Sequence, residues 1–270
     1  MGVLNVTPDS FSDGGQHQTS QEAVDHALRM VDEGACIIDI GGESTRPGAD
    51  RIDSDQQIAR TIPVIKQLRE QSQVLISIDT TRSSVAEAAL DAGANIINDV
   101  SAGCEDDQMF NLAANRGCGL ILMHRLASPQ HDSYSDQYNA DPIYDDVVQS
   151  VCKFLSKRCE AAKGAGVESE SLVIDPGLGF GKSVEQCYEL IKRMDKIQTL
   201  GFPVLCAVSR KSFIGAVTGK SVPADRVIGS AAVSVMHYQT GVRLFRVHDV
   251  AANCEALAVA SAVYGPVKTD

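Results

Sequence analysis

Eight short runs of mostly apolar residues, separated by segments with helical spacing, constrain the fold of this chain more than any other feature. The runs cover residues 2–6, 36–40, 74–78, 95–98, 119–123, 172–174, 204–208 and 242–247. Runs of this kind, with little strict alternation, are typical of parallel strands covered on both faces. Between them, apolar residues recur at intervals of three and four, as at Ile58, Ile62, Ile65 and Leu68. The pattern predicts repeated strand–helix units.

The length of the chain decides between the parallel architectures. A closed barrel of eight such units takes about 250 residues, and the chain has 270. We therefore expect one α/β domain over residues 1–270, a (β/α)8 TIM barrel with its active site at the C-terminal ends of the strands. A doubly wound open sheet is the alternative, but eight units leave little sequence for anything else.

Charge and composition exclude several classes of protein. Lys and Arg number 24 against 35 Asp and Glu, a net charge of -11, which argues against nucleic acids or a membrane surface as partners. No apolar run approaches the ~20 residues of a membrane span, and the first residues lack the features of a signal peptide. The eight cysteines form no CxxC pair. We therefore expect reduced, mostly buried thiols and a cytoplasmic protein.

A polar group follows every expected strand. If the strands form a barrel, all eight groups lie at one rim, where TIM barrels carry their active sites. Singly, each has a structural explanation: Asp79, for example, could simply cap the next helix. Eight such groups at one rim are harder to explain as turns and caps. They are Asn5, residues 41–48 (GGESTRPG), 79–82 (DTTR), 98–99 (ND), 123–125 (MHR), 175–182 (DPGLGFGK), 209–212 (SRKS) and 246–249 (RVHD).

These groups divide by chemistry into two sets. Asp79, Asn98, Asp175 and Lys211 offer the donors and acceptors that suit a flat, nitrogen-rich heterocycle. A second set, Arg46, Arg246 and His248, suits a phosphate or diphosphate. Asn5 offers a neutral oxygen, which together with diphosphate oxygens and water would suit Mg²⁺. The residues thus predict a heterocycle pocket beside a diphosphate pocket.

Familiar catalytic motifs do not fit. Residues 177–183 look like a phosphate loop, but only three residues separate Gly177 from Gly181-Lys-Ser, where the Walker pattern needs four. No nucleophile elbow or zinc-protease motif is present. The sequence therefore argues against a nucleotide-hydrolysing P-loop, a nucleophilic triad and a zinc site.

Five segments, residues 5–15 (NVTPDSFSDGG), 41–48, 175–182, 209–212 and 246–249, closely resemble the dihydropteroate synthase family of folate biosynthesis, in order along nearly the whole chain. The resemblance implies a homodimeric TIM barrel with Mg²⁺ as cofactor. It implies a transferase that condenses 6-hydroxymethyl-7,8-dihydropterin diphosphate with p-aminobenzoate and releases diphosphate. It also implies a target of sulfonamides, which mimic p-aminobenzoate.

The resemblance assigns roles to individual residues. Asp79, Asp175, Lys211 and Arg246 are expected to be catalytic, and residues 7–15 and 44–50 to close over the diphosphate. Pterin is expected at Thr45, Asp79, Asn98, Val100, Met123, Asp175, Lys211 and Arg246. Diphosphate is expected at Asn5, Arg46, Arg246 and His248, with Mg²⁺ on Asn5. p-Aminobenzoate is expected at Phe11, Pro47, Phe180, Lys211 and Ser212. Residues 126–141 receive no role.

The chemistry of the substrates favours a dissociative, SN1-like displacement. Loss of diphosphate from a CH₂ on an electron-rich dihydropterin leaves a delocalised cation, which the aromatic amine then attacks. Such a reaction needs charge stabilisation rather than a serine nucleophile. Two alternatives remain open: a methyltetrahydrofolate-type pterin methyltransferase, and a pterin-binding protein without catalysis.

Overall fold

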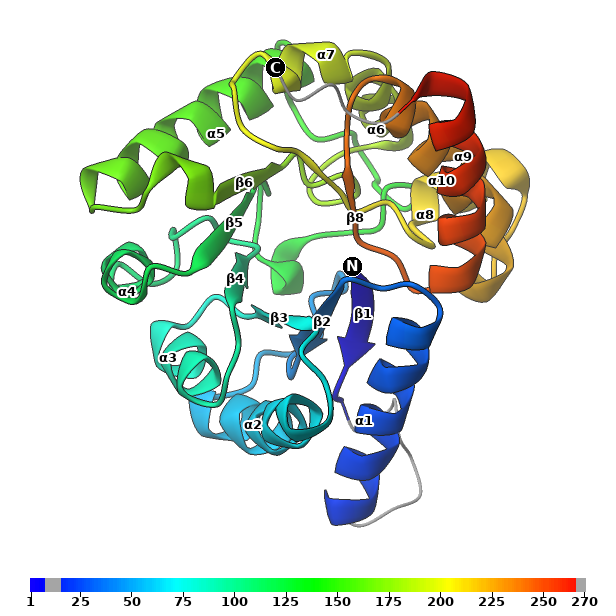
Figure 1. Cartoon of the computed structure of the whole chain (residues 1–270). Helices are drawn as coiled ribbons and strands as arrows, with labels where there is room; N and C mark the ends of the chain where they lie inside the picture. Colours follow the sequence, from blue (N-terminus) through cyan, green and yellow to red (C-terminus); the bar gives the residue numbers. More distant parts are fainter. Residues whose placement is uncertain (8–15, 266–270) are drawn as a thin grey trace.

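The structure, a computed structural model, describes residues 1–7 and 16–265 (Figure 1). The strands are β1 (Gly2–Asn5), β2 (Ile37–Gly41), β3 (Leu75–Asp79), β4 (Ile96–Asp99), β5 (Gly119–Met123), β6 (Leu172–Asp175), β7 (Leu205–Cys206) and β8 (Leu244–Phe245). The helices are α1 (Gln16–Asp32), α2 (Ser54–Gln71), α3 (Ser83–Asp91), α4 (Met109–Arg116), α5 (Val147–Gly164), α6 (Val184–Lys192), α7 (Met194–Gln198), α8 (Ser212–Thr218), α9 (Val227–Gln239) and α10 (Val250–Tyr264). Short 3-10 turns lie at η2 (Pro129–His131), η3 (Ser169–Ser171) and η4 (Pro223–Arg226).

The strands form a closed parallel barrel. Strands β1 to β6 pair in chain order, and β7 pairs with β8. Two parallel bridges join these sheets, Ile174 with Val204 and Gly2 with Val247. The second junction is reinforced by a hydrogen bond of 3.0 Å from the Val3 amide to the Val247 carbonyl. Figure 1 shows the helices surrounding the ring of strands. The TIM barrel expected from the sequence is confirmed.

The expected strands agree with the observed ones within one residue from β1 to β6. The last two expected strands, residues 204–208 and 242–247, are longer than β7 and β8. Beyond these two short strands, the backbone joins the ring through single bridges and isolated hydrogen bonds. One such bond, 2.9 Å long, runs from the Arg246 amide to the Cys206 carbonyl.

Alternation along the strands separates an apolar outer face from a more polar inner one. Successive side chains of a strand point to opposite faces. In β2, Ile38 and Ile40 are buried in the main hydrophobic core, and Asp39 between them accepts hydrogen bonds from Asn98 of β4 and from Arg246 after β8. In β3, Ser77 and Asp79 are buried polar residues on the face opposite Ile76 and Ile78. The helices therefore pack on the apolar face, and the barrel interior is left for polar chemistry.

The eight cysteines are free thiols. Cys118, Cys159, Cys187 and Cys206 are buried, whereas Cys36 and Cys104 are exposed. The expectation of mostly buried cysteines thus fits the first four and is wrong for the exposed pair. Within the described ranges, no helix has both the length and the apolar character needed to cross a membrane.

Candidate active site

The register of the sheet places one row of side chains at the C-terminal rim. Asn5 pairs with Gly41, Gly41 with Asp79, and Asp79 with Asn98. Gly41 has no side chain in the middle of this row. A Cβ there would lie 3.4 Å from the Cβ of Asp79 and 3.8 Å from Oδ1 of Asn5. The sequence thus brings side chains from β1, β3 and β4 together around a glycine.

Arg246, which follows β8, reaches into this row from beside β1, because β8 lies next to β1 where the barrel closes. Its Nε donates to Oδ2 of Asp39 at 2.6 Å, and its Nη2 donates to Oδ2 of Asp79 at 2.8 Å. Asn98 Nδ2 also donates to Asp39 Oδ2, at 3.2 Å. Asp39 is fully buried and was missed by the sequence analysis. A lone carboxylate inside the apolar strand IIDIG was the signal that could have revealed it.

Burial sets the electrostatics of this cluster. It raises the pKa of Asp79 to about 7, with Asp39 acting in the same direction and Arg246 against it. Burial also raises the pKa of Asp175 to about 6, opposed by the Gly177 amide and by Lys211. Burial, together with Arg246, lowers the pKa of Lys211 to about 8. Protonation states here are therefore poised near neutral pH.

Two carboxylate oxygens of the cluster accept no hydrogen bond within residues 1–7 and 16–265. Among the described residues, Oδ1 of Asp39 and Oδ1 of Asp79 are buried and have no hydrogen-bond partner. A buried acceptor without a partner costs free energy, and a ligand N–H group would relieve that cost. The pair therefore suits a ligand with several N–H groups.

An apolar surface lies beside the charged groups. Val100, Met123 and Phe180 form a small hydrophobic cluster separate from the main core. The ammonium of Lys211 lies 3.8 Å from the centroid of the Phe180 ring. The structure thus groups two residues expected at the pterin with two expected at p-aminobenzoate. Such a surface suits the face of a flat aromatic ligand.

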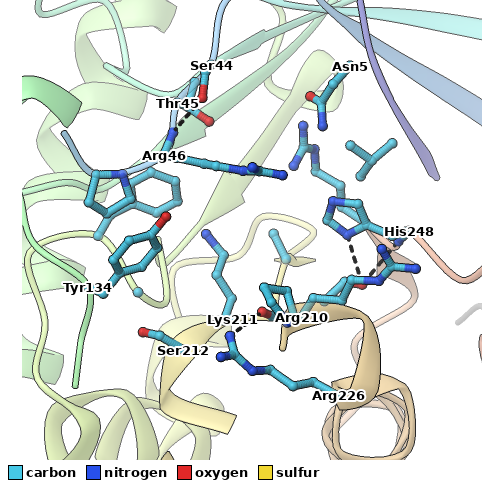
Figure 2. Close-up of a pocket in the computed structure, with 18 of the residues that line it drawn as sticks. Asn5, Ser44, Thr45, Arg46, Tyr134, Arg210, Lys211, Ser212, Arg226 and His248 are labelled. Atoms are coloured by element: carbon cyan, nitrogen blue, oxygen red, sulfur yellow. Dashed lines mark hydrogen bonds between the residues drawn. The ribbon is translucent and has the colours of Figure 1, made fainter. Parts of the chain in front are cut away.

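A cavity of about 610 Å³ opens at this rim. Figure 2 shows Arg46 and Lys211 extending into it, with Tyr134 on one side and Asn5 and His248 on the other. Of the residues predicted for the site, it is lined by Asn5, Thr45, Arg46, Pro47, Phe180, Lys211, Ser212, Arg246 and His248. The others in the described chain, Asp79, Asn98, Val100, Met123 and Asp175, are buried and do not line it. Phe11, and residues 8–15 of the first expected loop, lie outside the described residues.

His248 faces the cavity as a neutral ring. Burial, with the charges of Arg246 and Arg210, lowers its pKa to about 3. Its Nδ1 lies 3.1 Å from Oγ of Ser209, which already accepts the His248 amide at 3.1 Å. When the Ser209 hydroxyl donates to Nδ1, the ring proton is on Nε2. That N–H is a suitable donor to a phosphate oxygen.

Adjacent cations in the SRKS segment have different roles. Arg210, at a φ of 61°, donates to both carboxylate oxygens of Asp249, at 2.9 and 2.5 Å. Lys211 instead lies over Phe180. Both side chains line the cavity, and the charge of Arg210 is offset by Asp249.

The segment between β5 and α5, to which the sequence analysis gave no role, forms one wall of the cavity. Tyr134, Asp136 and Gln137 line it. The amide of Ser135 donates to Oγ of Ser212 at 3.0 Å. Because Oγ accepts there, its own proton is free to donate to a ligand. This segment lacks helical or strand periodicity, so its position could not be predicted from a local pattern.

An ionic network ties the rim loops together beside the cavity. Arg51 bonds Glu43 at 3.1 Å and Glu105 at 2.8 Å, and Thr81 donates to Glu105 at 2.6 Å. Arg125 also pairs with Glu105. Burial alone would raise the pKa of Glu105, but the hydrogen bonds from Thr81 and Arg51 outweigh it and lower the pKa. Four βα loops are thus joined at one point.

Residues 1–248 match the model of the pterin binding enzyme family. The chain is 47% identical over 262 residues to the dihydropteroate synthase of Streptococcus pyogenes serotype M3, covering 97% of this chain and 94% of that one. The chain belongs to the dihydropteroate synthase family.

Solved dihydropteroate synthases have the same fold. The Xanthomonas albilineans enzyme with 4-aminobenzoic acid superposes with a TM-score of 0.90 at 44% identity, over 99% of this chain and 93% of that one. The Yersinia pestis enzyme in a sulfonamide drug complex gives a TM-score of 0.89 at 37% identity, over 98% and 94%. This member of the dihydropteroate synthase family is therefore a transferase of folate biosynthesis.

Proposed function

We propose that this rim condenses 6-hydroxymethyl-7,8-dihydropterin diphosphate with p-aminobenzoate to 7,8-dihydropteroate, releasing diphosphate. One observation carries the proposal. Buried carboxylates with unpaired oxygens lie beside a cavity lined by Arg46, Arg246 and His248. A nitrogen-rich ring and a diphosphate joined by one carbon need this combination of charges side by side.

On the pterin side, Asp79 and Asp175 would accept hydrogen bonds from N–H groups of the ring edge, and Asn98 would accept and donate there. Val100 and Met123 would contact the face of the ring. Thr45, Lys211 and Arg246 would complete the pocket. Arg246 already satisfies one oxygen each of Asp39 and Asp79, which leaves their other oxygens for ligand N–H groups. Asp39 thereby joins the proposed set.

On the diphosphate side, Arg46, His248 and Arg246 would neutralise the leaving group. The side chain of Asn5 has no hydrogen-bond partner among the described residues and lines the cavity. No cluster of three or more His, Cys, Asp or Glu suited to a metal is found in the described residues. This donor set fits Mg²⁺ held by Asn5 together with diphosphate oxygens and water. Bound Mg²⁺ would offset the charge that develops on the departing diphosphate.

The p-aminobenzoate would lie between Pro47 and Phe180, and a contact with Phe11, outside the described residues, stays a prediction. Its carboxylate would meet the ammonium of Lys211 and the free hydroxyl proton of Ser212. Sulfonamides, which present a similar aromatic amine and acidic group, would compete for the same contacts.

The reaction follows from these contacts. The C–O bond to the diphosphate breaks and its electron pair leaves with the diphosphate. The cation left on the dihydropterin CH₂ is stabilised by the nearby carboxylates of Asp79 and Asp175. The amine nitrogen then forms the C–N bond and loses a proton to water. Catalysis rests on charge placement, and no protein nucleophile takes part.

A steady-state assay of diphosphate release, with and without p-aminobenzoate, tests the proposal. We expect release that depends on both substrates and on Mg²⁺. Tight pterin binding without turnover would indicate a non-catalytic binding protein. Methyl transfer from a methyltetrahydrofolate, with no diphosphate release, would indicate the methyltransferase.

We further propose that the enzyme is a homodimer joined through α9 and α10. Helix α9 has no charged residue and α10 has only Glu255. Their exposed side chains include Ile228, Met236, Val259 and Val263, which are 85%, 55%, 63% and 68% exposed. The two helices lie side by side on one flank (Figure 1). A second copy of the chain would cover this apolar face. That residues 1–270 form one domain, and that the protein is cytoplasmic, stay predictions.

A further inference from the structure

Lys182 is the last residue of the DPGLGFGK segment and is fully buried. Its Nζ lies 2.9 Å from the Gly177 carbonyl, 2.8 Å from the Phe180 carbonyl and 2.9 Å from Nδ1 of His124. The His124 carbonyl is a fourth, longer contact at 3.4 Å. A buried ammonium is costly unless its donors are used, and here the preceding loop and His124 each supply acceptors.

The loop is shaped to wrap around this ammonium. Gly177, Gly179 and Gly181 all have positive φ, at 66°, 83° and 64°. A Cβ on Gly177 would lie 1.8 Å from the His124 carbonyl oxygen. Alternating glycines give the backbone little stiffness of its own, so the conformation depends on what holds its carbonyls. Lys182 holds two of them.

Phe180 is the residue that this arrangement places at the site. Its carbonyl is bound by Lys182 on one side, and its ring lies under Lys211 and lines the cavity on the other. The neighbouring segment, residues 132–144, bonds the backbone next to Phe180 and not that of Phe180 itself. Asp132 and Tyr144 bond the amide and carbonyl of Gly181 instead, at 2.9 and 2.8 Å.

The pterin side is held differently. Met123 and Asp175 pair directly in the sheet, and the His124 amide donates to the Asp175 carbonyl at 3.0 Å. Strand hydrogen bonds fix the backbone of these residues without Lys182, and the Asp175 carboxylate also accepts the Gly177 amide at 2.7 Å. Loss of the ammonium should therefore be felt mainly at Phe180.

We propose that Lys182 is a positioning residue that sets Phe180 against Lys211 and thereby determines affinity for the aromatic amine. The inference rests on the proposed function, because it assigns the Phe180 side of the cavity to the amine. The neutral state of His124, whose pKa burial and Lys182 lower to about 2, agrees with an acceptor Nδ1 facing the ammonium.

The test uses Lys182→Met, which keeps the length of the side chain and removes its donors. We expect KM for p-aminobenzoate to rise at least about tenfold, with KM for the dihydropterin diphosphate changed less than about twofold. Lys192→Met, on an exposed lysine of α6, should change neither value. Lys182→Gln, which can still donate to carbonyls, should recover part of the loss.

A double-mutant cycle separates positioning from general damage. Phe180→Leu alone should raise the same KM, and Lys182→Met added to it should have little further effect, because both act through one ring. Additive effects, or equal rises in both KM values, would overturn the proposal. If Lys182→Met does not fold, the cycle is run with Lys182→Gln. If the wild-type enzyme releases no diphosphate, the proposed function fails by itself, and direct binding of p-aminobenzoate to the same variants decides the role of Lys182.

Discussion

A single arginine, Arg246, pairs with two buried carboxylates of the site, whose burial costs free energy. Arg246 binds one oxygen each of Asp39 and Asp79, and all three residues are mostly or fully buried. Breaking a buried pair by removing one member leaves an uncompensated charge, which costs more than the intact pair contributes. Replacing any one of the three residues with a neutral one should therefore destabilise the fold.

Replacement of Asp175 by asparagine tests the pterin side. Asp175→Asn keeps the shape and removes the charge, so it loses a charge-assisted hydrogen bond and the stabilisation of the cation. We expect pterin binding to weaken roughly ten- to hundredfold, with a further fall in kcat, measured by calorimetry and steady-state kinetics. Asp195→Asn, with a side chain 64% exposed, is the matched control. Near-normal turnover by Asp175→Asn would remove this residue from the site.

The pKa of Asp79 predicts a pH-dependent stability. In the fold it is raised from 3.8 to about 7, so the folded state prefers the protonated form. The stability that Asp79 contributes is fully present below pH 3.8 and is lost as pH rises towards 7. Asp79→Asn does not titrate, so its Tm relative to wild type should increase between pH 5 and pH 8. Thermal unfolding of both proteins across this range measures the difference. A constant offset would show that Asp79 is not perturbed by its surroundings.

At the scale of elements, the strand ends were predictable and the contacts between loops were not. Any parallel barrel gathers the residues that follow its strands at one rim, so Asn5, Asp79 and His248 could be grouped from chain order alone. The contact between Arg246 and Asp39 spans 207 positions, and no local pattern encodes it. Asp39 was nevertheless visible as a charge in an apolar strand.

Local sequence patterns could not predict which partners neighbouring residues contact, because the backbone geometry decides this. Arg210 and Lys211 are neighbours with the same charge, and only the backbone geometry at Arg210 sends one to Asp249 and the other to Phe180. Tyr134 lies on a segment whose position is fixed by single bonds such as that from Ser135 to Ser212. The closure of residues 44–50 over a diphosphate stays a prediction.

The ionic network at the rim should limit how often residues 44–50 open. Arg51→Met removes the contacts that fix the chain just after residues 44–50, including the bonds to Glu43 and Glu105. A loss of about 1 kcal/mol in local stability corresponds to roughly fivefold more opening. Proteolysis within residues 44–50 should therefore be about fivefold faster, and inorganic diphosphate should slow it. Arg116→Met breaks a pair with Asp91 between α4 and α3 instead, and serves as control. Equal cleavage rates in the two variants would mean that the network does not anchor this loop.

At the scale of the molecule, the proposed dimer interface lies apart from the cavity. The cavity opens at the rim of the strands, whereas the apolar face lies on the helical flank. A surface helix normally has one polar face, and α9 lacks charged residues altogether. An amphipathic pattern is absent because, in our interpretation, both faces of α9 are covered in the assembled enzyme.

Ile228→Glu tests this assembly. A charge placed on a side chain that is 85% exposed in the single chain should be harmless in a monomer, but would be desolvated in the proposed interface. Light scattering after size-exclusion chromatography should give twice 28.8 kDa for the wild type and a concentration-dependent shift to 28.8 kDa for the variant. Ile143→Glu, at a position 92% exposed between β5 and α5, should stay dimeric. Because the cavity lies within one chain, the monomer should keep its substrate affinities while its Tm falls. A wild type that is monomeric at all concentrations would leave α9 without its proposed partner, and a dimer that both variants retain would place the interface elsewhere.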